Sequence, residues 1–181
     1  MGTDRTTTSL VHSRDDARPD HTSGKVGKRR VVVTGDYRDF LIELRQAGAR
    51  FLVVGAHALA AHGIPRATVD LDIWIEPTPD NAGRVWQALA EFGAPLDALD
   101  VKESDLTRPE IVAQFGVAPN RIDILTSVTG LEFAEAWDER ITAIFEGEPV
   151  PFLGRESLVR NKRATGRTKD LADVEALGEP R

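Results

Sequence analysis

The sequence of 181 residues contains no cysteine, one methionine and one tyrosine. Without thiols there is no disulfide framework and no thiolate metal site, which fits a reducing cytoplasm. No segment approaches the roughly 18 to 20 consecutive apolar residues that a membrane helix needs, and the N-terminal residues lack the apolar centre of a secretory signal. These absences favour a soluble cytoplasmic protein that has no membrane partner.

The formal net charge of −6 is unevenly distributed along the chain. Residues 1–30 carry seven Lys/Arg and four Asp/Glu, whereas the remaining residues carry 16 and 25. An acidic body offers no broad surface for nucleic acid, so an RNA contact would be local or would use the cluster Lys28-Arg29-Arg30. The polar residues 1–30 predict a disordered tail, followed by a single domain over residues 31–181.

Hydrophobic spacing, glycines and prolines predict the elements of a small α/β domain, more closely α+β. Strands are expected over residues 51–54, 69–75, 111–115, 121–125, 140–145 and 150–153. Helices are expected over residues 37–47, 57–62, 79–92, 131–137, 155–164 and 169–177, with Asp36 and Thr78 as N-caps. Residues 96–108 predict irregular structure. The expected fold is a mixed β-sheet of about four to six strands with helices packed on it.

Two acids in an apolar strand, Asp70 and Asp72, are the most informative feature of the chain. Side chains two residues apart in a strand point to the same face. Two carboxylates about 4 Å apart repel by roughly 4 kcal/mol at an effective dielectric constant near 20. Protonation, an arginine or a divalent metal could offset this repulsion. The alternative is a strand face that water solvates.

A third acid, Asp123, lies between aliphatic residues in the segment Arg121-Ile-Asp-Ile-Leu125. If its strand is next to that of Asp70 and Asp72, three carboxylates meet on one face. Such a set suits one or two Mg²⁺ (or Mn²⁺) ions bound together with substrate phosphates. Two ions can stabilise both the attacking and the leaving oxygen of a phosphoryl transfer. The alternative is an ordinary edge acid paired with Arg121.

Gly55 separates a predicted strand from a predicted helix, where a glycine lets the backbone approach a ligand. The helix N-terminus behind it suits a phosphate, so the order of anion site and metal site predicts a nucleoside triphosphate with its metal. The alternative is that Gly55 is an ordinary turn glycine. Arg66 could neutralise a phosphate or pair with a surface acid. His57 and His62 are expected to pack or to form hydrogen bonds.

With these motifs the chain resembles the nucleotidyltransferase superfamily of the DNA polymerase β type, in particular its minimal bacterial branch of AbiEii-like toxins, MenT-like toxins and MNT proteins. That family has Gly-Ser or Gly-Gly, a spacer, Asp-x-Asp and a third acid on a later strand. This chain has Gly55-Ala56, thirteen residues, Asp70-Leu-Asp72 and Asp123, followed by Asn161-Lys-Arg and Lys169-Asp-Leu-Ala-Asp-Val174. The resemblance spans about residues 36 to 177. Asp170 is nevertheless expected to cap its helix.

The resemblance implies transfer of a nucleotidyl group from a nucleoside triphosphate, such as ATP, to an RNA 3′ end such as tRNA, a protein hydroxyl or a small molecule. Its toxin and MNT members make a toxin–antitoxin system one setting for this activity. The resemblance also implies that Asp70, Asp72 and Asp123 are catalytic metal ligands. The residues expected to bind the triphosphate are Gly55, Ala56, Arg66 and Lys162.

Ala56 departs from the family pattern, because a serine hydroxyl usually helps to hold phosphate there. This departure keeps a second class open, a non-catalytic or weakly catalytic MNT-like antitoxin that acts by binding a cognate toxin. A third class is a metal phosphohydrolase of the haloacid dehalogenase kind. Its Asp-x-Asp motif usually opens the first strand, whereas Gly55 and an earlier strand precede the motif here.

Overall fold

The computed structural model describes residues 37–98, 100–116 and 120–180. The expected tail over residues 1–30, the Asp36 cap and most of the turn at 118–120 lie outside these residues. The helices are α1 (Tyr37–Gln46), α2 (Gly55–Ala61), α3 (Pro79–Glu91), η1 (Leu96–Ala98), η2 (Glu103–Thr107), α4 (Phe133–Asp138), α5 (Arg155–Thr165) and α6 (Thr168–Ala176). The strands are β1 (Phe51–Val53), β2 (Asp70–Ile75), β3 (Val112–Phe115), β4 (Arg121–Leu125), β5 (Ile141–Phe145) and β6 (Glu148–Phe152). Among the described residues, no helix is long and apolar enough to cross a membrane.

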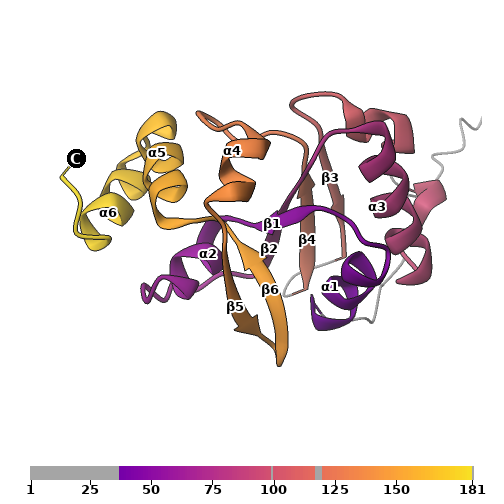
Figure 1. Ribbon diagram of the computed structural model, residues 1–181, viewed down its shortest axis with the longest axis horizontal. Coiled ribbons are helices and arrows are strands. Elements are labelled where there is room, and N and C mark those ends of the chain that lie inside the picture. The colour runs from indigo at the N-terminus through magenta and orange to yellow at the C-terminus, as the bar shows by residue number, and fades with distance from the viewer. Residues whose placement is uncertain (1–36, 99, 117–119, 181) are drawn as a thin grey trace, which may run out of the picture.

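The six strands form one mixed sheet in the order β3-β4-β2-β1-β6-β5. β2 and β4 are parallel neighbours, and β1 is parallel to β6. The remaining neighbours, β1 with β2, β3 with β4 and β5 with β6, are antiparallel. Figure 1 shows α1 and α3 on one side of the strands, and α2, α4 and the α5–α6 pair on the other. The fold is therefore a mixed α/β architecture with helices on both sides of the sheet.

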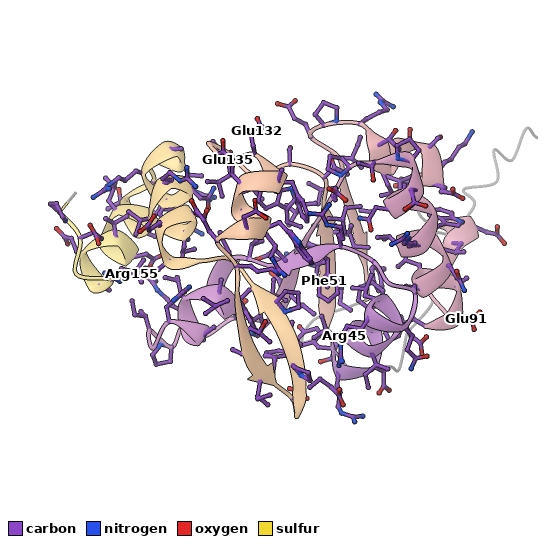
Figure 2. The ribbon with its side chains drawn as sticks, in the orientation of Figure 1. Arg45, Phe51, Glu91, Glu132, Glu135 and Arg155 are labelled. Carbon is purple, nitrogen blue, oxygen red and sulfur yellow. The ribbon has the colours of Figure 1, made fainter. Side chains whose placement is uncertain are left out.

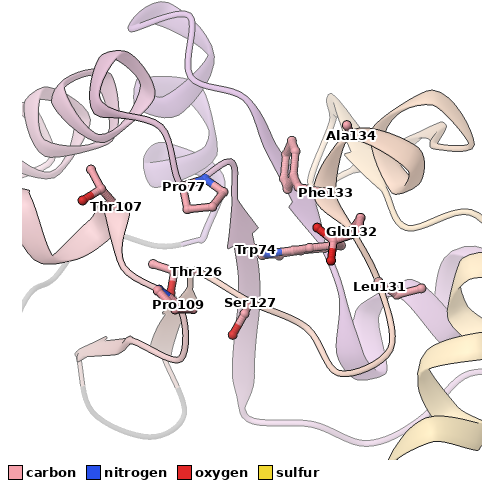
Figure 3. A pocket seen from close by; sticks show the side chains of 10 residues that line it. All are labelled: Trp74, Pro77, Thr107, Pro109, Thr126, Ser127, Leu131, Glu132, Phe133 and Ala134. Carbon is pink, nitrogen blue, oxygen red and sulfur yellow. The ribbon is translucent and has the colours of Figure 1, made fainter.

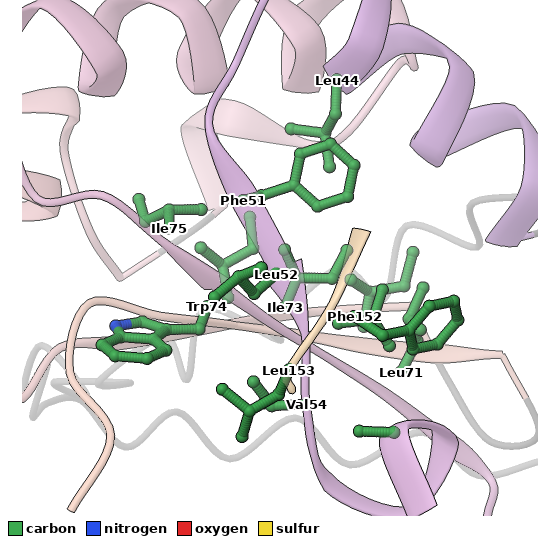
Figure 4. Close-up of a cluster of buried hydrophobic side chains, with 14 of the residues drawn as sticks. Leu44, Phe51, Leu52, Val54, Leu71, Ile73, Trp74, Ile75, Phe152 and Leu153 are labelled. Carbon is green, nitrogen blue, oxygen red and sulfur yellow. The ribbon is translucent and has the colours of Figure 1, made fainter. Parts of the chain in front are cut away.

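The side of the sheet that faces α1 and α3 is apolar. Leu71, Ile73 and Ile75 of β2 are completely buried there, and so is Leu44 of α1. Figure 4 shows Leu44, Phe51 and Ile75 close together in this core. Because β-strand side chains alternate, the same strand sends Asp70, Asp72 and Trp74 to the opposite side. The apolar core thus fixes which way the two acids point.

Most predicted elements are confirmed, with boundaries shifted by one or two residues. α2 begins at Gly55 rather than at residue 57, so the helix starts where β1 has just ended. Thr78 is the predicted N-cap of α3, since its hydroxyl accepts a hydrogen bond from the Asn81 N–H and Pro79 is the first helical residue. Residues 96–108, predicted to be irregular, contain the two short helices η1 and η2.

Candidate active site

β2 and β4 bring three acids together on one face of the sheet. In this parallel pair, Asp70 is opposite Arg121 and Asp72 is opposite Asp123. Residues opposite each other on neighbouring strands share a face, so Asp123 lies on the same side as Asp70 and Asp72. Asp123 is 7% exposed. The structure therefore has the three-acid arrangement that the sequence predicted, with Arg121 in the fourth position.

Arg121 lies between the acids and pairs with two of them. Its Nη2 donates to Asp70 Oδ2 at 2.6 Å and to Asp123 Oδ2 at 3.3 Å, and its Nε is 3.2 Å from Asp123 Oδ1. Gln114 of β3 is opposite Asp123 and donates through Nε2 to Asp123 Oδ2 at 3.2 Å. Asp123 thus pairs with Arg121, as one prediction had it, and also lies on the same face as Asp70 and Asp72, as the other had it.

Gly55 is in direct contact with the acids across the β1–β2 junction. Its φ is +63°, a left-handed value that favours glycine. A Cβ at this position would overlap Oδ2 of Asp72. The Val54 N–H also donates to the Asp72 carbonyl at 3.0 Å, which fixes the chain just before α2. Gly55 is therefore more than a turn residue, because only a residue without a side chain leaves room for the Asp72 carboxylate.

The electrostatics of the three acids are unbalanced. Burial, followed by the charges of Asp123 and Asp70, raises the pKa of Asp72 from 3.8 to about 6, although Arg121 and Lys162 act in the opposite direction. Buried oxygens remain without a hydrogen bond at Asp70 Oδ1 and Asp123 Oδ1. One guanidinium does not neutralise three carboxylates, so an additional cation bound at this site would be stabilised by the remaining negative charge.

The residues present suit a divalent ion, since carboxylate oxygens are the preferred ligands of Mg²⁺ and two of them have no hydrogen-bond partner. In the described part of the chain, however, no three acidic, histidine or cysteine side chains are arranged as a metal site. The Arg121 contacts give the physical reason, because its guanidinium lies between Asp70 and Asp123.

Lys162 of α5 lies in a second group of charges beside the first. Its Nζ is 2.8 Å from Asp170 Oδ1 and 3.1 Å from Asp173 Oδ2, both on α6. Arg66 also pairs with Asp173. Lys162 is nevertheless close enough for its charge to lower the pKa of Asp72. The two predicted phosphate ligands, Arg66 and Lys162, therefore share Asp173 as a partner. The acid that pairs with Arg66 is buried, so the alternative that placed it with a surface acid is not what the structure shows.

Asp170 is not a helix cap, so that expectation is wrong. The residue is completely buried and accepts hydrogen bonds from Lys162, Thr165 and Arg167. The N-cap of α6 is Arg167, and no side chain caps this helix. Burial alone would raise the pKa of Asp170, but the hydrogen bonds from Lys162, Arg167 and Thr165 outweigh it and lower the pKa to about 2. Asp170 is a buried ionic anchor between α5 and α6.

The two histidines of the α2 region pack and form hydrogen bonds, as expected. The His57 ring contacts Tyr37 and Phe145 edge-on, with ring centroids 5.9 and 5.0 Å away. Burial lowers the pKa of His57, although the charge of Glu146 and a hydrogen bond with the Asp70 backbone oppose this. His62 Nε2 is 2.9 Å from the Leu153 carbonyl. The lowered pKa favours the neutral form of the His57 ring, which forms a hydrogen bond with the Asp70 backbone.

A cavity of about 310 Å³ lies beyond the acids on the same face of β2. Trp74, which follows Asp72 by one pleat, lines it together with Thr126 and Ser127 after β4 and Phe133 of α4. Figure 3 shows the nitrogen edge of Trp74 turned toward Pro77 and Thr126. The indole Nε1 is buried and has no hydrogen-bond partner. The cavity can hold a ligand of modest size on the face of β2 that carries the acids, although none of the three acids lines it.

Comparison with known proteins bears on the fold of this chain. No family model matches the chain, and no curated protein matches it. The fold is a nucleotidyltransferase fold. A crystal structure from Thermotoga maritima, of a protein proposed to be a nucleotidyltransferase, is similar over 78% of this chain and 87% of the other, with a TM-score of 0.51 and 16% sequence identity. At that identity the similarity concerns the fold, not the activity.

Sequence reasoning missed Gln114 and Asp173 as parts of the site. Gln114 could have been found from a hairpin prediction with the correct register, because β3 and β4 pair it with Asp123. Asp173 could not, since only the packing of α5 on α6 brings it to Lys162 and Arg66. A local pattern reveals partners across a hairpin but not across two helices.

Proposed function

We propose that this protein is a metal-dependent nucleotidyltransferase that transfers a nucleotidyl group from a nucleoside triphosphate to an acceptor hydroxyl. The observation that supports it best is the register of β2 and β4, which pairs Asp72 with Asp123 on a face where two buried carboxylate oxygens accept no hydrogen bond. The low-identity similarity to the Thermotoga maritima protein agrees with this class.

In this proposal Asp70, Asp72 and Asp123 hold one or two Mg²⁺ or Mn²⁺ ions, which neutralise the triphosphate and the charge that develops on it. The backbone at Gly55 and Ala56, together with Lys162 and Arg66, binds the triphosphate. Asp123 accepts the proton of the acceptor hydroxyl while the hydroxyl oxygen forms its bond to the α-phosphorus. The bond between the α-phosphorus and the bridging oxygen breaks, and pyrophosphate leaves with that electron pair.

We place the acceptor in the cavity beside Trp74. Successive strand residues advance by about 3.3 Å, so the Trp74 Cα is roughly 7 Å from that of Asp72 on the same face. Hydroxyls of Thr126 and Ser127 and the ring of Phe133 line this space. The acceptor can be a tRNA end, a protein hydroxyl or a small molecule, and the acidic chain weakens the case for RNA.

The test is transfer of label from each α-labelled nucleoside triphosphate, with Mg²⁺ or Mn²⁺, to total tRNA, to cellular protein or to a small-molecule fraction. Label in one fraction with the wild type, and none with Asp72→Asn, is the expected result. Isothermal titration of the same triphosphates and metals measures binding independently of the acceptor. Absence of both binding and transfer under every condition would contradict the proposal.

A second candidate function is an MNT-like antitoxin or interaction protein without turnover. Two observations favour it: Ala56 lacks the hydroxyl that commonly holds phosphate, and Arg121 already pairs with Asp70 and Asp123. Under this alternative, the protein binds a cognate toxin equally well with or without triphosphate. Asp72→Asn would then leave the neutralisation of a toxin encoded beside its gene unchanged, whereas an enzyme would lose it.

A further inference from the structure

Arg121 has a place in the site that the proposed function does not explain. It precedes Asp123 by two residues on β4 and lies opposite Asp70 on β2. Its guanidinium contacts carboxylates of both strands, at 2.6 Å from Asp70 Oδ2 and 3.2 Å from Asp123 Oδ1. The side chain is still 41% exposed. The guanidinium of Arg121 is thus held by the two acids, while part of its side chain is exposed to solvent.

The guanidinium and a divalent ion require the same oxygens. An oxygen that accepts a short hydrogen bond from a cation has that lone pair engaged, and two cations within a few ångströms repel each other. Without a metal, Arg121 is the nearest compensation for Asp70 and Asp123. When an ion binds these acids, the arginine must leave them, and its long exposed side chain gives it the freedom to do so.

The displaced guanidinium has a natural second partner. Arginine presents a planar set of donors that suits phosphate oxygens as well as carboxylates. A metal-bound triphosphate brings both charges at once, with the ion for the carboxylates and the phosphates for the arginine. The other cations close to the site, Lys162 and Arg66, are paired with Asp170 and Asp173. Arg121 is the one whose present partners are the acids that the ion would take.

We propose that Arg121 is a resident counter-cation that competes with a free divalent ion for Asp70 and Asp123, and that transfers to a phosphate when ion and triphosphate bind together. This inference rests on the proposed function, because it assumes that the ion binds these acids. It makes the site prefer the metal–triphosphate complex over the bare ion.

The test compares wild type, Arg121→Gln and a matched control in the full chain. Arg45→Gln is the control, since Arg45 has the same 41% exposure and pairs with Glu148 at 3.0 Å. Figure 2 shows Arg45 beside the ribbon of α1, the helix that faces the apolar side of the sheet. Binding of Mn²⁺ alone is measured by electron paramagnetic resonance. Binding of a non-hydrolysable triphosphate analogue with saturating Mn²⁺ is measured by calorimetry.

The two measurements should change in opposite directions. Arg121→Gln should bind Mn²⁺ alone roughly tenfold more tightly, which corresponds to about 1.4 kcal/mol, and should bind the metal–analogue complex roughly tenfold more weakly. Arg45→Gln should change neither. A purely structural role for Arg121 would weaken both kinds of binding together, so the opposite signs distinguish the two explanations.

Arg121→Lys covers the case in which the glutamine variant does not fold. A lysine retains the positive charge but cannot donate to both strands at once, so its Mn²⁺ affinity should lie between those of wild type and Arg121→Gln. Wild type that binds Mn²⁺ with the same affinity as the folded variants overturns the inference and leaves the proposed function intact. If no variant binds Mn²⁺ alone, the competition is refuted, and the proposed function fails with it only if no variant binds the metal–analogue complex either. If only Arg121→Gln and Arg121→Lys bind it, the competition is confirmed.

Discussion

The described residues contain two groups of buried or half-buried acids, which differ in how well their charge is compensated. On α6, Asp170 and Asp173 are paired with Lys162, Arg66 and Arg167. On β2 and β4, Arg121 pairs with Asp70 and Asp123 but not with Asp72, and two carboxylate oxygens lack hydrogen bonds. The pKa values follow this difference, at about 2 for Asp170 and about 6 for Asp72. The compensated group stabilises the fold, whereas the uncompensated group keeps its capacity for a ligand.

The largest expected effect is on the compensated group. Asp170→Ala leaves Lys162 buried without its closest partner, and removal of one member of a buried pair costs about 3–5 kcal/mol. Urea unfolding followed by circular dichroism measures the loss. The control is Asp80→Ala, another acid in a first helical turn, which is 78% exposed and pairs with Arg84. Because exposed pairs contribute little, similar losses for the two variants would remove the distinction between the groups.

The opposite sign is expected at the uncompensated group. Asp72→Asn removes a charge that its neighbours repel and should stabilise the metal-free protein by about 1–2 kcal/mol near neutral pH, after allowance for solvent screening. The same variant should lose metal binding and any nucleotidyl transfer. Thermal unfolding in a chelator, alongside the labelling assay, tests both statements. A destabilised Asp72→Asn would show that the three carboxylates are better compensated than the contacts indicate.

The pH dependence of stability should separate the two groups. The folded pKa of Asp170 is lowered from 3.8 to about 2, so its contribution is complete above about pH 4 and is lost as the pH falls through 2. The folded pKa of Asp72 is raised from 3.8 to about 6, so its destabilisation develops as the pH rises from 4 through 6.

Chelator-treated wild type should therefore show a loss of stability between pH 4 and 6 that Asp72→Asn lacks. Both proteins should share the loss at lower pH. Unfolding free energies at half-unit pH intervals provide the measurement, and a flat wild-type profile between pH 4 and 6 would count against the raised pKa.

The smallest expected effect concerns the glycine that contacts Asp72. Gly55→Ala places a side chain in a left-handed conformation, which costs about 1–2 kcal/mol, and also pushes the Asp72 carboxylate from its position. Gly63→Ala is the control, because Gly63 has φ +85° and a Cβ there would have nothing within 4 Å. The two variants should lose comparable backbone stability, while only Gly55→Ala weakens Mn²⁺ binding. Equal Mn²⁺ affinity in both would show that the contact is not needed.

The secondary structure was predictable where apolar and polar residues alternate regularly along the sequence. The alternation through residues 69–75 and 121–125 predicts two buried strands and the side on which their acids lie, and Thr78 with Pro79 predicts the start of α3. The order of the strands was not predictable in this way. That β4 lies next to β2 follows from packing between distant segments, and it decides whether Asp123 meets Asp72.

The candidate site was predictable in its acids and not in its cations. Carboxylates in apolar strands are conspicuous, because burial makes them costly. Arginines and lysines occur throughout an ordinary surface, so their sequence positions did not reveal that Arg121 lies among the acids or that Lys162 is buried against α6. The expected cap at Asp170 failed for the same reason, since only the packed α5–α6 pair supplies its three donors.

β1 has three residues, and its ladder with β6 consists of the single pair Val53 and Phe152, extended by one bond from the Leu153 N–H to the Val53 carbonyl. The sheet therefore has a narrow seam between β1 and β6, with the β5–β6 hairpin and the two C-terminal helices beyond it. So few backbone bonds make this seam the place where partial opening costs least. Opening there would move Lys162 of α5 away from Asp70 and Asp72 of β2, so the two groups of residues proposed to bind the metal and the triphosphate would separate while each remained folded.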